Sequence, residues 1–232
     1  MEPLEKYQAG QLLLIDKPVK WTSFDVVNKL RYAIKVKKIG HAGTLDPLAT
    51  GLLLIGTGKW TKKLEELQGK DKVYEGIIEL GKTTPSYDLE TDFDSESDFA
   101  HLTEADLRKA AEQLTGTIEQ VPPVHSAIKI GGERAYKKAR RNEEVKMKVR
   151  QVTIHTFELV KIELPEVHFR IACSKGTYIR SMAHDFGKLL EVGGYLKSLR
   201  RTGIGAYDVA EAKTVEAFLK QLQSEREAHE DN

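Results

Sequence analysis

The chain has 232 residues, with 36 Lys and Arg against 35 Asp and Glu, so its formal net charge is +1 at pH 7. Hydrophobic residues make up 40% and charged residues 31%, which is typical of a globular protein and excludes a disordered polar chain. The longest uncharged stretch has 12 residues, well short of the ~20 needed to span a bilayer. We expect no signal peptide, and the single cysteine, Cys173, cannot form an internal disulfide, so we expect a cytoplasmic protein.

The first half of the chain predicts short strands and helices in irregular order. Residues 11–15 predict a buried strand that ends at Asp16-Lys17-Pro18, because proline interrupts strand pairing. Thr22-Ser23 is an N-cap for a helix to about Ile34. Further along we expect a loop over most of 40–51, a strand at 52–55, an amphipathic helix at 59–67, a strand at 73–80, an exposed acidic insertion or long hairpin at 86–99, and a helix from about 103 to 114.

The second half predicts more strand than helix. Residues 116–130 are expected to be extended, with a turn at Gly131-Gly132. The remaining elements are a basic helix at 134–141, strands at 145–149, 152–164 and 167–174, a helix at 176–190, an extended segment at 195–207 and a short helix at 215–222 before a frayed acidic tail. This order lacks regular βαβ alternation, so it predicts an α+β fold with a large mixed or antiparallel sheet and flanking helices.

The net charge near zero is the sum of segments with opposite charge. Residues 129–150 contain nine basic residues, opposed only by Glu133, Glu143 and Glu144, whereas 86–106 contain eight acidic residues and no Lys or Arg. A polyanion responds to the field within about a Debye length, ~8 Å at physiological salt. Any one segment can be a solvated face, but basic groups that recur beside the motifs below favour a surface that contacts phosphates.

Common cofactor motifs are absent from the sequence. The seven histidines form no His-x-x-x-His pair and no second cysteine is present, which argues against a zinc site. The segment 56–59 fails the spacing of a phosphate-binding loop, and no dinucleotide fingerprint occurs. We therefore expect no metal, nucleotide or redox cofactor.

Two segments combine glycines with reactive side chains. Residues 40–51 place Asp46 between three glycines and just before Pro47, and a carboxylate on such a turn suits a catalytic acid, base or nucleophile. The alternative is an Asp that caps the following turn. Residues 173–180 lead from a strand through Gly176 into a helix whose start carries Tyr178 and Arg180. The alternative there is an ordinary helix start with a surface tyrosine.

Taken together, these segments resemble the tRNA pseudouridine-55 synthases of bacteria, the TruB family. Residues 40–51, Gly-His-Ala-Gly-Thr-Leu-Asp-Pro-Leu-Ala-Thr-Gly, are similar to the active-site signature of that family. The resemblance covers about residues 10–210, with further similar stretches in the family's order at 13–18 with 22–23, 72–75, 122–129, 174–180 and 199–202.

The resemblance implies a role for each of six residues. Asp46 is implied to be the nucleophile that detaches uracil from its ribose, lets the ring rotate and rejoins it through carbon 5. Tyr74 is implied to stack on the flipped uracil and to handle the carbon-5 proton, and Arg180 to pair with Asp46 and keep it ionised. Tyr178 and Leu199 are implied to line the pocket. His41 is implied to insert into the RNA loop in place of extruded bases.

The implied substrate is uridine 55 in the T loop of tRNA, with the T arm as the recognised part. We expect residues 1–210 to form a catalytic domain that acts as a monomer without metal or membrane. Residues 211–232 are too few for the C-terminal PUA-type domain of many family members, and segment 129–150 is a candidate to replace its RNA contacts. Lys20 occupies a turn position where glycine is common in the family. A non-catalytic RNA-binding protein or tRNA-folding chaperone is the main alternative; a small-substrate hydrolase is disfavoured by the basic groups.

Overall fold

The computed structural model describes residues 4–230 except 127, 140, 142 and 144, and divides the chain into two compact units. The first unit comprises residues up to Tyr74 together with residues from Arg200 onward, and the second comprises Glu75–Leu199. Ala127, Arg140 and Glu144, which belong to the predicted segments 122–129 and 129–150, lie outside the described residues. None of the described helices is both long enough and apolar enough to span a membrane.

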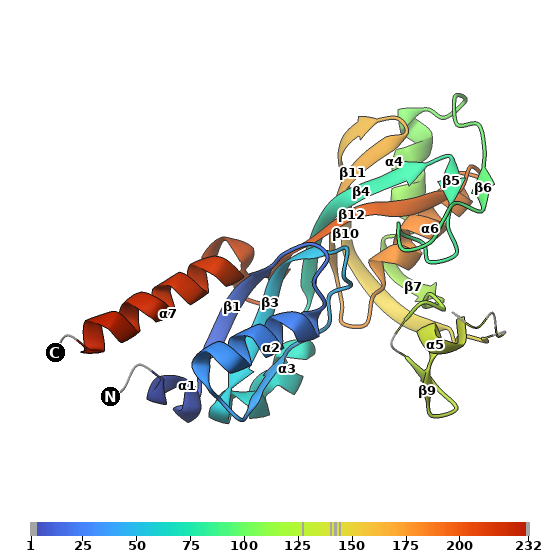
Figure 1. The fold of residues 1–232 in the computed structure, drawn as a ribbon. Coiled ribbons are helices and arrows are strands. Elements are labelled where there is room, and N and C mark those ends of the chain that lie inside the picture. Colours follow the sequence, from blue (N-terminus) through green and yellow to red (C-terminus); the bar gives the residue numbers. More distant parts are fainter. Residues whose placement is uncertain (1–3, 127, 140, 142, 144, 231–232) are drawn as a thin grey trace. The chain divides into compact units, whose positions relative to one another are not determined.

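The first unit is built around β1 and β3, which pair antiparallel (Figure 1). The Thr22 cap of the first long helix is confirmed, because its hydroxyl accepts from Asp25 N at 3.0 Å and the Asp25 carboxylate accepts from Thr22 N at 2.8 Å. The elements in this unit are α1 (Glu5–Ala9), β1 (Leu12–Lys17), α2 (Ser23–Ile34), β2 (Ile39–His41), β3 (Thr50–Thr57), a 3₁₀ turn η1 (Gly58–Lys63), α3 (Leu64–Gln68), β13 (Tyr207–Asp208), η2 (Val209–Glu211), β14 (Lys213–Thr214) and α7 (Val215–Glu230).

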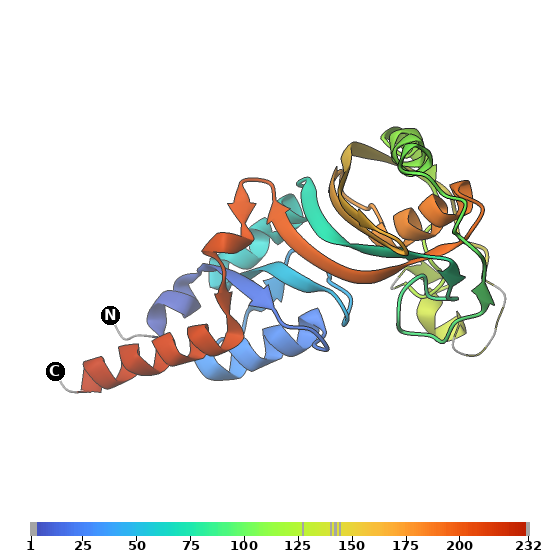
Figure 2. The ribbon, with the colours of Figure 1, turned by 90° about the horizontal axis from the view of Figure 1, so that it is seen from above.

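Strand β3 is buried on both of its faces. Leu53 and Ile55 belong to one hydrophobic cluster with side chains of α2 and α7, and Leu52 and Leu54 belong to a second cluster with Leu67 of α3. Figure 2 shows α2 and α7 on one side of the strands and α3 on the other. The alternation of side chains along a strand therefore explains why this segment is continuously apolar.

The second unit contains a long antiparallel pair of strands and flanking helices. Strand β10 pairs with β11 on one side and with β7 on the other, and α4 contacts both β10 and α6. The aromatic rings of Phe157, Phe169 and Phe186 meet between β10, β11 and α6. The elements of this unit are β5 (Lys82–Thr83), β6 (Ser95–Glu96), α4 (Glu104–Gln113), β7 (Gly116–Gln120), β8 (Lys129–Ile130), β9 (Glu133–Arg134), α5 (Ala135–Ala139), β10 (Arg150–Glu163), β11 (Glu166–Cys173) and α6 (Ile179–Leu189).

Strands β4 (Lys72–Leu80) and β12 (Gly194–Ile204) each contribute residues to both units. Strand pairing follows the order β14-β1-β3-β12-β4-β11-β10-β7, with β13 paired to β12 and β2 paired to β3. Parallel and antiparallel pairs both occur along it, since β3 and β12 are parallel and β1 and β3 are antiparallel. The predicted α+β fold with a large mixed sheet is confirmed.

The acidic segment 86–99 is not simply an exposed insertion. Its hairpin is confirmed by the pairing of β5 with β6. However, Ser86 and Asp88 at its start are buried, and the hydroxyl of Ser86 donates to Asp88 Oδ1 at 2.6 Å. The prediction of exposure was wrong here because it used the net charge of the segment, which does not report the hydrogen bonds of an individual carboxylate.

Several predicted boundaries were wrong for local reasons. Residues 145–149 form no strand; Val149 is exposed, and pairing with β7 starts only at Arg150. The helix expected from Gly176 starts at Ile179, because Gly176 has a positive φ and Tyr178 is extended. The helix expected over 59–67 begins as the 3₁₀ turn η1.

The C-terminal helix is longer than predicted. It continues past Leu222 to Glu230, with Gln221–Glu225 and Gln223–Glu227 hydrogen bonds at (i, i+4) spacing. Lys6 also binds Glu225 at 2.7 Å and so ties this helix to α1. The expected division of the chain near residue 210 stays a prediction.

Candidate active site

Asp46 lies half-buried in the loop between β2 and β3 of the first unit. The loop turns at Asp46, whose carbonyl accepts from Ala49 N at 3.1 Å. Gly43 and Gly51 have positive φ, and a Cβ at Gly51 would lie 2.3 Å from the carbonyl oxygen of Arg201. Glycine is therefore required at position 51 both for its backbone angle and for the close approach of β12.

The N-terminus of α2 holds the residue that precedes Asp46. The hydroxyl of Ser23 accepts from Leu45 N at 2.9 Å and lies 3.2 Å from Leu45 O, and Ser23 is buried. On the other side of Asp46, Lys20 N donates to Pro47 O at 2.7 Å. Lys20 has a φ of 68°, so the turn position where glycine is common is occupied by a lysine in the left-handed region. The carboxylate thus sits on backbone that is anchored on both sides.

Two buried cations complete this anchorage. Lys17 Nζ donates to the carbonyls of Trp21 at 2.6 Å and Pro18 at 3.0 Å. Burial lowers the pKa of Lys17 to about 8. The positive charge of Arg201 lowers this pKa further, and the negative charge of Asp46 raises it. Arg201 is 1% exposed and donates to Leu52 O at 2.8 Å and Gly43 O at 3.1 Å, so it joins β12 to both ends of the loop.

His41 and Tyr74 also belong to the first unit. His41 ends β2 and is half-buried, and its pKa is lowered by burial and by the nearby charge of Arg201, so the neutral imidazole is favoured near pH 7. Tyr74 lies on β4 and is only 9% exposed. Their implied contacts with RNA remain predictions.

In the second unit, Tyr178 is the N-cap residue of α6. The side chain of Gln120 accepts from Tyr178 N at 2.8 Å and donates to Tyr178 O at 3.1 Å, so both main-chain groups of Tyr178 are fixed. The guanidinium of Arg150 lies 5.5 Å from the centre of the Tyr178 ring, within the range of a cation–π contact. Gln120 is fully buried at the end of β7, and nothing in its sequence context marked it as a positioning residue.

Arg180, in the first turn of α6, is 4% exposed. It donates to Ser86 O at 3.1 Å and its Nε lies 3.6 Å from Asp88 Oδ2. Asp88 is equally buried and also accepts from Glu90 N at 2.9 Å. This buried ion pair orients Arg180, and the sequence interpretation missed Asp88 because its neighbours are mostly exposed acids.

The structure brings together several stretches that carry the family resemblance. In the first unit, Arg200 binds Asp16 through two hydrogen bonds of 2.7 and 3.0 Å, which joins stretch 199–202 to stretch 13–18. In the second unit, Ser181 donates to Val121 O at 2.7 Å, which joins α6 to the segment after β7. Leu199 lies on β12 as the last residue of the second unit. Asp46 and Arg180 belong to different units, so their pairing stays a prediction.

A metal cluster is not evident in the part of the chain that the structure describes. No group of three or more His, Cys, Asp or Glu side chains there could hold a metal ion. The chemistry that the described side chains offer is that of carboxylates, cations and a buried tyrosine. Such a set suits nucleophilic or proton-transfer chemistry on a substrate that is itself anionic.

Comparison with known proteins gives two matching family models. The model described as TruB family pseudouridylate synthase, N-terminal domain, matches residues 31–179, and the tRNA pseudouridylate synthase B C-terminal domain matches residues 180–232. A tRNA pseudouridine synthase B of Flavobacterium johnsoniae is 54% identical over 94% of this chain and 99% of its own length. One from Chlorobaculum tepidum is 50% identical over 93% of this chain and 92% of its own.

Solved structures agree with these matches. A chain in the crystal structure of a Cbf5-Nop10-Gar1 complex has a TM-score of 0.73 and 27% identity, over 95% of this chain. The present chain spans 58% of the length of that neighbour. The shared fold therefore covers nearly all of the chain described above.

Proposed function

Because this chain belongs to the TruB family of pseudouridylate synthases, we propose that it isomerises uridine 55 in the T loop of tRNA to pseudouridine. The reaction breaks the bond between C1′ of the ribose and N1 of uracil and forms one between C1′ and C5. N1 gains a proton and C5 loses one, so atoms and electrons balance without a co-reactant. A single carboxylate with a proton acceptor is sufficient for such an isomerisation.

The observation that carries the proposal is the anchorage of Asp46. Its loop is held by the hydroxyl of Ser23, by the Lys20–Pro47 backbone bond and by the buried guanidinium of Arg201. A nucleophile gains most when its position is fixed before the substrate arrives. The family signature places its nucleophile at this residue, so we assign that role to Asp46.

The other site residues follow from the same proposal. Tyr74 stacks on the flipped uracil and takes part in moving the C5 proton, and Arg180 pairs with Asp46 and keeps it ionised. Flipping a base costs a few kcal/mol, and stacking on an aromatic ring returns about 1–3 kcal/mol of it. His41 fills the space in the RNA loop that the base leaves, and Tyr178 and Leu199 line the pocket. The protein acts as a monomer in the cytoplasm, on the T arm of tRNA.

The test is modification mapping of an unmodified T-arm transcript incubated with the purified protein alone. We expect pseudouridine at position 55 in a buffer that contains a chelator and no nucleotide. A transcript with cytidine at position 55 is the matched control and should stay unmodified. A wild-type protein that binds the transcript but leaves uridine 55 unchanged would favour the RNA-binding or chaperone alternative and refute the enzyme proposal.

A further inference from the structure

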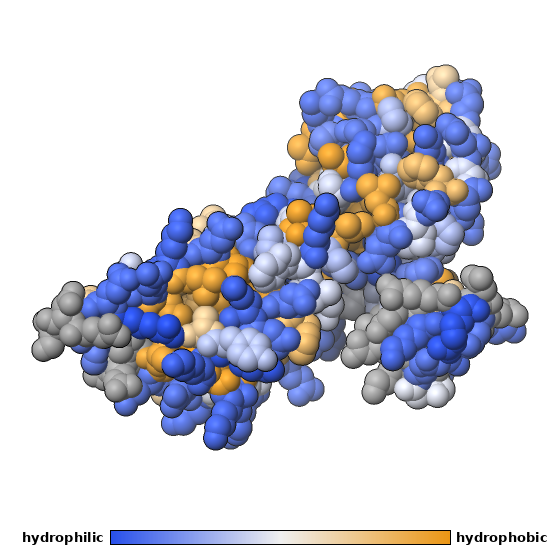
Figure 3. Space-filling model, in the orientation of Figure 1, coloured by the Kyte–Doolittle hydropathy of each residue, from blue (hydrophilic) through white to orange (hydrophobic). Residues whose placement is uncertain are grey.

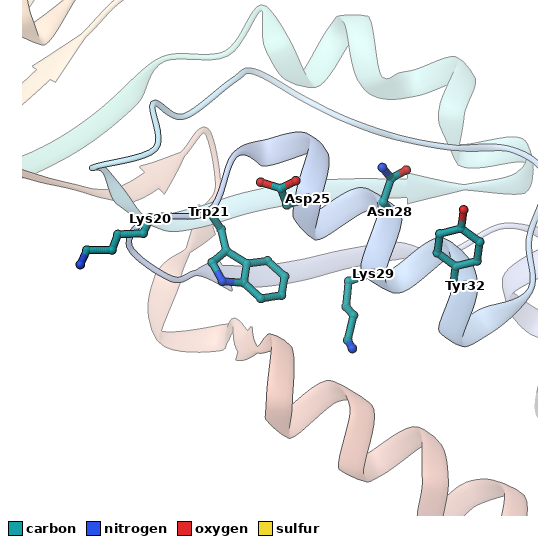
Figure 4. Close-up of a pocket in the computed structure, with 6 residues that line it drawn as sticks. All are labelled: Lys20, Trp21, Asp25, Asn28, Lys29 and Tyr32. Carbon is teal, nitrogen blue, oxygen red and sulfur yellow. The ribbon is translucent and has the colours of Figure 1, made fainter. Parts of the chain in front are cut away.

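A shallow depression of about 420 Å³ lies on the surface of the first unit, outside the Asp46 loop. It is lined by the turn before α2 and by the exposed side of that helix (Figure 4). Its lining residues are Lys20, Trp21, Asp25, Asn28, Lys29 and Tyr32. The side chains of these residues have no role in the function proposed above.

Aromatic side chains are unusually accessible around this depression. Tyr32 is 80% exposed and Phe24, one helical turn before Asn28, is 61% exposed. Trp21 packs partly against the core of the unit and presents the rest of its ring to the depression. Figure 3 also shows hydrophobic side chains, in orange, at the surface of the first unit among hydrophilic ones, in blue. Exposed rings that gather at one depression favour a binding surface, whereas single exposed rings do not.

The charge around these rings is positive. Lys20 and Lys29 line the depression, and the only acidic lining residue, Asp25, is held in the capping box by Thr22 at the positive end of the helix. The end of α2 and the segment after it add further basic residues, namely Arg31, Lys35, Lys37 and Lys38. Rings interleaved with cations favour a ligand that has both flat bases and phosphates.

One lining residue of the depression is hydrogen-bonded to the Asp46 loop through its backbone. Lys20, at one end of the depression, donates its N–H to Pro47 O at 2.7 Å. Lys20 therefore belongs both to the lining of the depression and to the backbone that holds the Asp46 loop. Asn28 accepts from Arg31 at 3.2 Å through Oδ1, so its amide N–H groups can donate to a base edge.

We propose that this depression is a second RNA-binding site, which holds unpaired nucleotides whose bases stack on Trp21 at one end and on Tyr32 at the other. The phosphates next to these nucleotides contact Lys20 and Lys29. The site adds affinity for RNA beyond the segment that is modified, and it does not depend on isomerisation. Its ligand is single-stranded RNA or a nucleotide that is unpaired in a folded RNA.

The first experiment uses Trp21 as a local probe. The chain contains two tryptophans, so Trp60→Phe leaves Trp21 as the only one. Hexa-adenylate serves as the ligand because it has no uridine and cannot be a substrate, which separates this test from that of the proposed function. We expect saturable quenching of Trp21 fluorescence, because a stacked base quenches the indole. Absence of quenching would overturn the proposal, and it is the result expected if this face docks a protein instead.

The second experiment compares two substitutions at the depression with a control substitution, all in the Trp60→Phe background. Lys29→Glu should weaken hexa-adenylate binding about tenfold and reduce the salt slope by about 1, and Tyr32→Ala should weaken it several-fold. Lys109→Glu, at an exposed position of α4 in the second unit, is the matched control and should change affinity less than twofold. Equal effects of Lys29→Glu and Lys109→Glu would refute a local site. Circular dichroism verifies that each variant is folded, and the rate on an isolated T-arm hairpin should stay within twofold of wild type.

Discussion

Lys17 lies in an environment that is unfavourable to its charge. It is 0% exposed, and its ammonium is stabilised by main-chain carbonyls next to the Asp46 loop. Burial lowers its pKa to about 8 in the folded protein, compared with 10.5 for the ordinary side chain. The folded state therefore releases the proton at lower pH than the unfolded state does, and stability increases with pH between these two values.

Comparison with Lys17→Met tests this linkage. From pH 7.5 to 9.5, the free energy of unfolding of the wild type should rise by about 2 kcal/mol relative to the variant, because the cost of keeping Lys17 charged is removed. Urea titrations at the two pH values measure the difference, and Lys59→Met at the exposed turn η1 is a control that should show no such change. A difference between wild type and Lys17→Met that is constant with pH would contradict the linkage.

The buried ion pair of Asp88 and Arg180 leads to a second prediction about a single residue. Asp88→Asn keeps the shape of the side chain but removes the charge beside a guanidinium that is 4% exposed, so we expect a loss of about 3 kcal/mol in stability. Glu104→Gln, which breaks the exposed pair with Arg108, should cost less than about 0.5 kcal/mol. Pseudouridine formation should fall at least tenfold in Asp88→Asn alone. Equal stability losses would show that Asp88 does not neutralise Arg180.

Among the helices and strands, α2 supports the Asp46 loop, because its first residue, Ser23, binds the backbone of Leu45. Its capping box is repeated at the start of α4, where Thr103 and Asp106 make the same contacts. The two helices differ in the residue after the cap, since only α2 carries there a side chain, Ser23, that binds the backbone of the loop. A matched pair of substitutions therefore separates helix stability from support of the site.

We predict that Thr22→Ala and Thr103→Ala each cost about 1 kcal/mol of stability, because each removes one N-cap. Only Thr22→Ala should also lower the rate of pseudouridine formation, by several-fold, since loosening the first turn of α2 displaces Ser23. Denaturant titrations and initial rates on the T-arm transcript measure the two effects. Equal rates for both variants would mean that α2 does not position the loop.

The sequence predicts those features that are determined by neighbouring residues, and it does not predict contacts between residues far apart in the chain. The Thr22 cap and the buried strand β3 are correct because their signals lie in neighbouring residues. The contacts of Gln120 with Tyr178 and of Asp88 with Arg180 join residues 58 and 92 positions apart, and no local pattern reports them. For the same reason the full length of α7 was missed, because Lys6 stabilises it from the other end of the chain.

At the scale of the whole molecule, the total charge of +1 conceals an uneven distribution. Residues 29–38 contain five basic residues and residues 129–150 contain nine, whereas residues 86–106 contain eight acidic residues and no Lys or Arg. An RNA ligand interacts with the local field, so near-neutrality of the chain does not argue against RNA binding. Affinity for tRNA should fall steeply as salt increases, because phosphate contacts release counterions. Filter binding at 50 and 200 mM salt measures the slope, and a flat dependence would contradict this account.

The role of Asp46 as the nucleophile on a preformed loop can be tested directly by one substitution. Asp46→Asn preserves the size of the side chain and removes its charge, so the loop anchored by Ser23 and Arg201 should stay intact. On a T-arm transcript, we predict no pseudouridine at position 55 and an affinity within about threefold of the wild type. Pseudouridine formation by Asp46→Asn at the wild-type rate would contradict this role.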